Sequence, residues 1–164
     1  MLLKLIYAAT ADGGIGLNNK LPWPKIGADM QRFRNATMGH ACIMGRKTFE
    51  SLPCALDGRH EVVISSKYQE LQRFHGKKRA LFVDSFETAR KCAPDAFVIG
   101  GLQTFNTALE FVDSVWFTLI LGEYQADTFV VADSQTWFPA DKFDCWEEQQ
   151  VDLRCRFFRF RKRQ

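Results

Sequence analysis

The sequence predicts an α/β fold built as one mainly parallel, twisted sheet of eight strands, with an antiparallel strand pair at its C-terminal end and about four flanking helices. Three observations lead to this prediction. The 164 residues are 46% hydrophobic and 13% aromatic, which is enough to bury a core within a single domain over residues 1–164. Short apolar runs alternate with helix-like segments as far as residue 121. Beyond that residue only strand-like segments follow.

The apolar runs have the length and bounded character of buried strands. Six fall in the first part of the chain and two near its end, at Leu2–Ala9, Ala41–Met44, Val62–Ser65, Ala80–Val83, Ala96–Ile99, Val115–Leu121, Cys145–Val151 and Arg154–Arg161. Strands that alternate with helices form parallel sheets, whereas two strands joined by a short turn pair antiparallel. The last two runs therefore form the antiparallel pair.

Four segments between these strands repeat apolar residues every three or four positions, as amphipathic helices do. They are Ala28–Met38, Lys47–Leu52, Phe86–Cys92 and Thr104–Phe111. Ligands of such sheets bind beyond the carboxyl ends of the strands. The strand-to-helix junctions are therefore where a site is expected.

Composition excludes several classes of protein. The five cysteines and three histidines form no CxxC motif and no zinc-like spacing, so we expect no metal and no disulfide framework, and reduced thiols of the cytoplasm. The N-terminal apolar run, "MLLKLIYAA", is too short to span a membrane. The basic, aromatic end of the chain, "RCRFFRFRKRQ", favours a strand with a solvated basic face, and nucleic-acid binding is the less favoured alternative.

Three junctions suit phosphate groups. "MGRKTF" follows a strand with a glycine turn and two cations at a helix start, "VIGGLQTF" follows one with paired glycines, and "ISSK" ends one with two hydroxyls and a lysine. Free backbone N–H groups at helix starts bind anions, and glycines allow a ligand to approach the backbone. Each motif alone is compatible with an ordinary turn. Together the three favour a dinucleotide.

Asp29 is the candidate for chemistry. An acid in the first turn of a helix stabilises that helix, and this alone could explain it. Yet Phe33 and Ala36 share its face, so the carboxylate is expected among apolar neighbours, where its pKa rises and it can hold a proton near neutral pH. No second carboxylate, Ser-His or Cys-His arrangement accompanies it. One buried acid beside a dinucleotide suggests hydride transfer to a protonated C=N bond.

Taken in order, the motifs resemble those of dihydrofolate reductases over nearly the whole chain. The matching pieces are "GIGLNNKLPW" (14–23), "AD" (28–29), "IMGRKTFES" (43–51), "GRHEVVISS" (58–66), "VIGG" (98–101), "FTLI" (117–120) and "ADT" (126–128). The resemblance implies an NADPH-dependent reduction of 7,8-dihydrofolate to 5,6,7,8-tetrahydrofolate, which supplies one-carbon metabolism and thymidylate synthesis. It also implies an antifolate target that is cytoplasmic and monomeric.

The resemblance implies four catalytic residues. Asp29 would be the sole ionisable group of the site, binding the 2-amino group and N3 of the pterin. It would promote protonation of N5, directly or through an oriented water, while NADPH delivers hydride to C6. Thr118 would hydrogen-bond this carboxylate and Trp23 would brace a water. Leu21 lies at the position of a mobile loop that closes over the nicotinamide.

The binding residues follow from the same resemblance. Those for the substrate are Ile6, Ala8, Asp29, Met30, Phe33, Leu52, Leu56, Arg59, Ile99, Phe105 and Thr118. Those for the cofactor are Ala8, Ile15, Gly45, Arg46, Lys47, Thr48, Ser65, Ser66, Gly100, Gly101, Leu102, Gln103 and Thr104. Arg59 would pair with the carboxylate of the glutamate tail. Arg46 and Ser66 favour NADPH over NADH, and the peptide that links Gly100 to Gly101 is typically cis in the family.

Departures from the family pattern and two other functions stay open. "PKIGA", between Trp23 and Asp29, is about one residue longer than in common bacterial forms, and Leu102 and Gln103 replace a frequent glycine and arginine. A pyrimidine reductase of riboflavin synthesis shares the fold and cofactor. A non-catalytic protein that docks through its basic end is the alternative from another class.

Overall fold

The computed structural model describes residues 2–74, 80–130 and 141–163. The helices in these ranges are α1 Gly27–Thr37, α2 Arg46–Ser51, α3 Tyr68–Phe74, α4 Phe86–Cys92 and α5 Leu102–Ala108. The strands are β1 Lys4–Thr10, β2 Gly14–Gly16, β3 Ala41–Gly45, β4 His60–Ile64, β5 Ala80–Val83, β6 Phe97–Gly100, β7 Ser114–Ile120, β8 Thr128–Phe129, β9 Phe143–Asp152 and β10 Cys155–Lys162.

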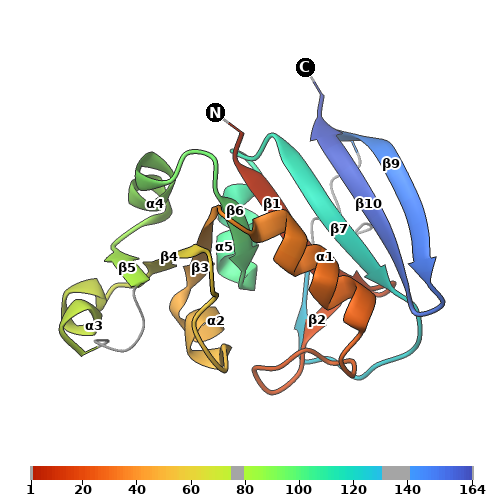
Figure 1. Ribbon diagram of the computed structural model, residues 1–164, viewed down its shortest axis with the longest axis horizontal. Coiled ribbons are helices and arrows are strands. Elements are labelled where there is room, and N and C mark those ends of the chain that lie inside the picture. Colours follow the sequence, from red (N-terminus) through yellow and green to blue (C-terminus); the bar gives the residue numbers. More distant parts are fainter. Residues whose placement is uncertain (1, 75–79, 131–140, 164) are drawn as a thin grey trace.

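The strands form an eight-stranded sheet in the order β5-β4-β3-β6-β1-β7-β10-β9 (Figure 1). Strands from β5 to β7 in this order are parallel, and β10 pairs antiparallel with both β7 and β9. This confirms the predicted α/β sheet and its antiparallel C-terminal pair. Strand β6 inserts between β3 and β1, so the carboxyl ends of these three strands meet at one edge.

Alternation along the strands gives the sheet two distinct faces. One face packs on α4 and α5 through a cluster that includes Leu5, Ile43, Val98 and Phe117. The opposite face carries Cys42, Met44 and Val63 against α2. Helix α1 lies on this second face (Figure 1). Its Arg32 donates hydrogen bonds to backbone carbonyls of both β7 and β10. We call this second face the α1–α2 face.

The structure differs from the prediction in its short elements. It has five helices in the described ranges rather than about four, because α3 forms at Tyr68–Phe74, where no helix was predicted. The carbonyl of Ser65 accepts from the Tyr68 N–H (3.2 Å), and this turn starts the helix. The two-stranded sheet of β2 and β8 was not predicted either. Strands of two and three residues are too short to show the alternation that predicts a strand.

Cross-strand pairing largely neutralises the basic end of the chain. Three arginines of the last strand and its end pair with acids of β9: Arg156 with Glu148 (3.7 Å), Arg159 with Glu147 (3.1 Å) and Arg163 with Asp144 (2.8 Å). Three cations of this basic stripe are therefore paired with acids of the neighbouring strand. No helix in the described ranges is long and apolar enough to cross a membrane.

Candidate active site

Asp29 lies in the first turn of α1 and is partly buried against the α1–α2 face. Burial raises the pKa of its carboxyl, and a hydrogen bond from Thr118 and the charge of Arg32 lower it in part. The expected desolvation is therefore present. The expected surroundings differ, because a hydroxyl and a guanidinium stand beside the carboxylate as well as apolar groups.

Arg32 is the functional neighbour that the sequence analysis missed. Its Nη1 donates to the Thr118 hydroxyl (2.9 Å) and to the carbonyl of Phe117 (2.7 Å), and its Nη2 donates to the carbonyl of Phe158 (2.9 Å). The only sequence signal was an arginine three positions after Asp29, on an adjacent part of the helix surface. Asp29 is therefore not the sole ionisable group here.

A small apolar cluster supports the start of α1. Trp23 (5% exposed) and Ile26 (1% exposed) pack with Ile120 and Cys155, and with the partly buried Ala8 and Ala28 among others. The longer connection "PKIGA" thus inserts Ile26 into the protein as an anchor, and α1 begins at the next residue. This anchor fixes the approach of Asp29 to β7.

The strand residues predicted for the site share the α1–α2 face. Ile6 and Ala8 alternate with Leu5 and Tyr7, and Ala8 lies opposite Thr118 in the parallel register of β1 and β7. Ile99 of β6 packs against the cluster of Cys42, Met44 and Phe49. The structure therefore brings Ile6, Ala8, Ile99 and Thr118 to the same face as Asp29.

The connection between α2 and β4 supplies a second wall. Leu52 and Leu56 pack on the same cluster as Ile99. Arg59 donates from Nη1 to the Thr37 hydroxyl (3.1 Å), and its guanidinium carbon lies 5.8 Å from the centre of the Phe33 ring. This connection therefore meets the C-terminal half of α1. Met30 is 42% exposed at the outer side of the helix.

The ends of β3 and β6 form a cradle with little free space. A Cβ atom at Gly101 would approach the Thr48 hydroxyl to 3.1 Å, and one at Gly45 would approach the Thr104 hydroxyl to 3.2 Å. Gly100 has a φ of +137°, and the peptide that links it to Gly101 is cis, as the resemblance implies. Five predicted cofactor residues thus converge at one edge of the sheet.

The remaining predicted cofactor residues lie around this cradle. Leu102, Gln103 and Thr104 are the first residues of α5. Arg46, the first residue of α2, pairs with Glu50 (2.7 Å), and Lys47 beside it is exposed. Ser65 is 7% exposed and accepts the Lys67 N–H (3.1 Å), whereas Ser66 is exposed. Of the two serines, Ser66 is thus the one open to a ligand.

The segment before Trp23 is held by hydrogen bonds to Asp127, a residue distant in the sequence. The Asn18 N–H donates to the carboxylate of Asp127 (2.7 Å), and the Asp127 N–H donates to the carbonyl of Gly16 (2.9 Å). Asn18 and Asn19 both have positive φ angles. Ile15 packs on the main core, while Leu21 is 53% exposed, which leaves its side chain available to cover a ligand.

Phe105 is the predicted substrate residue that lies apart from the others. It is 5% exposed, and its ring packs 5.2 Å from that of Tyr7 on the α4–α5 side. A Cβ at Gly100 would lie 3.5 Å from its Cζ, so Phe105 supports the cradle from below. In the described residues no group of three or more metal-ligating side chains comes together.

Comparisons with known proteins agree with this geometry. The family model described as dihydrofolate reductase matches residues 2–162. A type 8 dihydrofolate reductase of Escherichia coli is 39% identical over 134 residues, which cover 78% of this chain and 79% of that protein. The dihydrofolate reductase of Staphylococcus haemolyticus is 31% identical over 153 residues, covering 92% and 84%.

A solved structure has the same fold. The dihydrofolate reductase of Enterococcus faecalis, complexed with NADP(H) and RAB-propyl, superposes with a TM-score of 0.81 over 99% of this chain and 97% of that one, at 23% sequence identity.

Proposed function

The chain belongs to the dihydrofolate reductase family, and we propose that it reduces 7,8-dihydrofolate to 5,6,7,8-tetrahydrofolate with NADPH, using Asp29 as the group that binds the pterin and promotes its protonation. The observation that carries this proposal is the Asp29 carboxylate on the α1–α2 face, desolvated yet hydrogen-bonded by Thr118. No comparable support exists for a pyrimidine reductase or for a non-catalytic docking protein.

Asp29 has the chemistry that a pterin requires. A carboxylate accepts two hydrogen bonds from an amidine-like edge such as the 2-amino group and N3 of the pterin. Because burial raises its pKa, Asp29 can hold a proton closer to neutral pH than an exposed aspartate. It thus promotes protonation of N5, either directly or through a water that Trp23 braces. Hydride transfer to C6 then meets an electrophilic C=N bond.

The rest of the substrate would follow the walls of the site. The carbonyls of Ile6 and Ile99 would accept from the pterin amino group, with Ala8 beside them. Met30, Phe33, Leu52 and Leu56 would contact the aminobenzoyl ring. Arg59, whose guanidinium is oriented by Thr37, would pair with the carboxylate of the glutamate tail.

The glycine cradle suits a pyrophosphate. Side chains at Gly45 or Gly101 would fill the space in front of Thr104 and Thr48, so bare backbone is needed where a ligand approaches closely. Thr48, Leu102, Gln103 and Thr104 would hold the phosphates, and Arg46, Lys47 and Ser66 the adenosine end. When bound, NADPH supplies the hydride. Arg46 would exchange its pairing with Glu50 for the extra phosphate of this cofactor.

We also propose a monomeric protein of the cytoplasm, built as a single domain over residues 1–164, that supplies tetrahydrofolate to one-carbon metabolism. The five thiols, of which none forms a disulfide in the described residues, are compatible with a reducing compartment.

Turnover measurements test the proposal. Purified protein mixed with NADPH and dihydrofolate should lose nicotinamide absorbance, methotrexate should stop that loss, and NADH should support a slower one. If no turnover occurs at any pH from about 5 to 8, the proposed activity is wrong. Turnover of a pyrimidine substrate that resists methotrexate would support the riboflavin-pathway alternative instead.

A further inference from the structure

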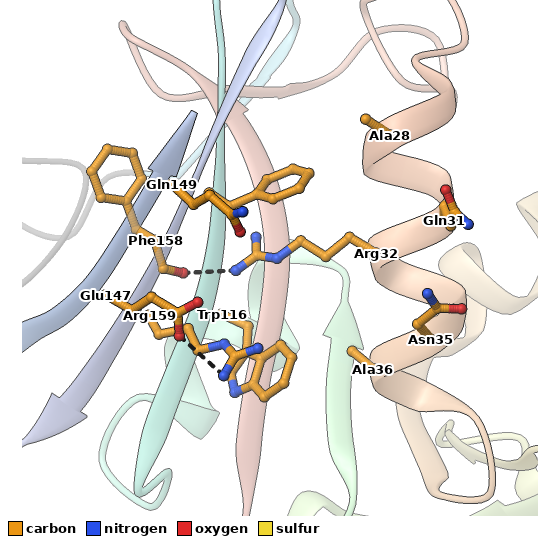
Figure 2. A pocket seen from close by; sticks show the side chains of 11 residues that line it. Ala28, Gln31, Arg32, Asn35, Ala36, Trp116, Glu147, Gln149, Phe158 and Arg159 are labelled. Carbon is orange, nitrogen blue, oxygen red and sulfur yellow. Dashed lines mark hydrogen bonds and ion pairs between the residues drawn. The ribbon is translucent and has the colours of Figure 1, made fainter. Parts of the chain in front are cut away.

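Arg32 joins three elements at the back of the candidate site. It extends from α1 toward the sheet (Figure 2), where its guanidinium donates to two carbonyls, one on β7 and one on β10, and to the Thr118 hydroxyl. The guanidinium carbon of Arg32 also lies 4.4 Å from the centre of the Phe157 ring. A residue held by this many contacts has one orientation, so whatever it does to Thr118 it does with fixed geometry.

The direction of these hydrogen bonds links Arg32 to Asp29. A guanidinium can only donate, so the Thr118 oxygen must accept from Arg32. The single hydroxyl hydrogen of Thr118 is then left for the carboxylate of Asp29, with which it forms a hydrogen bond. Hydrogen bonds in a chain polarise one another, and a cation at one end strengthens the donor at the other. The chain therefore runs from Arg32 through Thr118 to Asp29.

The charges around Arg32 leave it protonated. Burial and the nearby Arg159 lower its pKa to about 10, which is still above neutral pH, and Asp29 and Glu147 act in the opposite direction. Glu147 pairs with Arg159 at 3.1 Å. Cys155, which also faces Asp29 and Arg32, has its pKa raised to about 11 by burial and stays a neutral thiol. At neutral pH Arg32 is therefore positively charged, and it is this cation that donates to the Thr118 hydroxyl.

Arg32 also borders a groove that the proposed substrate site does not use. Together with Gln31, Asn35 and Ala36 it lines a groove of about 430 Å³ between α1 and the strands β9 and β10 (Figure 2). Arg159 covers Trp116 on the opposite side, with 3.9 Å between the guanidinium carbon and the ring centre. Arg159 makes no bond to Thr118 among the contacts of the described residues, and it therefore provides a matched control.

We propose that Arg32 is a positioning residue that acts through the Thr118 hydroxyl to hold the Asp29 carboxylate oriented and ionised. The proposal rests on the function proposed above for Asp29, but its first consequence is a property of the ligand-free protein. If Arg32 were only structural, removing it would change stability and leave the titration of Asp29 as it was.

The experiment measures the pKa of Asp29 directly. Protein labelled with 13C at the aspartate carboxyl is titrated by NMR, and the Asp29 resonance is assigned by its loss in Asp29→Asn. Arg32→Met should raise the pKa of Asp29 above that of the wild type. Arg32→Lys should raise it less, because an ammonium keeps the charge but cannot donate to two strands and the hydroxyl together. Arg159→Met should leave it unchanged.

A double-mutant cycle tests the route through Thr118. Arg32→Met should lower kcat/KM at neutral pH roughly tenfold, because the carboxylate loses the orientation in which it accepts the paired hydrogen bonds of the pterin. In a Thr118→Val background the same substitution should have much less effect on the pKa of Asp29, because the connecting hydroxyl is gone. Thermal unfolding of each variant separates loss of folded protein from loss of function, and Arg32→Lys carries the test if Arg32→Met does not fold.

Two results would overturn the proposal. One is a pKa of Asp29 that Arg32→Met and Arg32→Lys leave unchanged. The other is a pair of shifts in this pKa, from Arg32→Met and Thr118→Val, that simply add in the double variant. Neither depends on turnover. A wild-type protein without reductase activity but with the Asp29 titration shifted by Arg32→Met would disprove the proposed function and leave this inference standing.

Discussion

The two long faces of helix α1 differ in kind. The face toward Arg59 carries Met30 and Phe33, which are apolar and partly exposed. The face toward β9 and β10 carries Gln31, Arg32 and Asn35 above a polar groove. Asp29 lies between the two. Under the function and the role of Arg32 proposed above, α1 presents the substrate to the carboxylate from one side and sets the chemistry of that carboxylate from the other.

The two faces also differ in how their charges are satisfied. On the first face Arg59 is held by the Thr37 hydroxyl and by the Asp57 carbonyl (3.2 Å), which are neutral partners, so its charge is available to an anion. On the second, Arg159 has Glu147, and Arg32 has two carbonyls and Thr118. Substitutions on the first face should therefore alter ligand binding. Substitution of Arg32 on the second should alter the pKa of Asp29.

Asp29→Asn should have the largest effect, because it removes the carboxylate on which both faces of α1 act. An amide can neither supply a proton nor accept the paired bonds of a protonated pterin, and lost general-acid function costs at least roughly a hundredfold. Turnover of dihydrofolate with NADPH at neutral pH measures the loss. Asp141→Asn changes an exposed carboxylate in the turn before β9 and should be silent. Equal activity of Asp29→Asn and wild type would remove Asp29 from the mechanism.

Arg59→Met tests the first face alone. Losing a charge-assisted pair with the glutamate tail should raise the KM for dihydrofolate roughly tenfold, while kcat changes little, since the pair is the same in ground and transition states. A substrate truncated before the glutamate should not distinguish the variant from wild type. Arg34→Met, which alters an exposed arginine of α1, is the matched control. An unchanged KM for dihydrofolate would mean that Arg59 does not meet the tail.

The difference between the faces also explains what the sequence could predict. The first face lies in or beside contiguous motifs, "AD" and "GRHEVVISS", so the resemblance to the family implied roles for Asp29, Phe33 and Arg59. Local patterns likewise located most strands within two residues. The second face depends on β10 pairing with β7, which sets Phe158 opposite Phe117 and within reach of Arg32. Contacts between residues separated by more than eighty positions are not encoded in any local pattern.

Phe105 illustrates the same limit. Its place in the sequence, after the paired glycines, assigned it to the substrate, yet its ring lies on the α4–α5 side against Tyr7. Burial was predictable from its apolar character, but the choice of face was not, because a residue in the first turn of α5 can turn to either side of the sheet edge. Its contact with the substrate stays a prediction.

The stability of the ligand-free protein provides the smallest expected effect. The pKa of Asp29 is raised in the folded state above the ordinary value of 3.8. Between the ordinary pKa and the raised pKa of the folded state, the folded protein therefore binds more protons than the unfolded protein. Its stability is lost as pH rises through that window. Asp29→Asn carries no such cost. Its Tm should exceed that of wild type by a few degrees at neutral pH, and the two should converge below the ordinary value.

The two faces can be separated in this same measurement. If Arg32 offsets part of the cost of the buried carboxylate, its loss makes an ionised Asp29 more destabilising. The gain in Tm from Asp29→Asn at neutral pH should then be larger in an Arg32→Met background than in wild type, and unchanged in an Arg59→Met background. Thermal unfolding of wild type, the three single variants and the two double variants, at neutral and at acidic pH, measures this. Equal gains in both backgrounds would mean that the two faces act on Asp29 alike, and that the asymmetry of α1 has no electrostatic consequence.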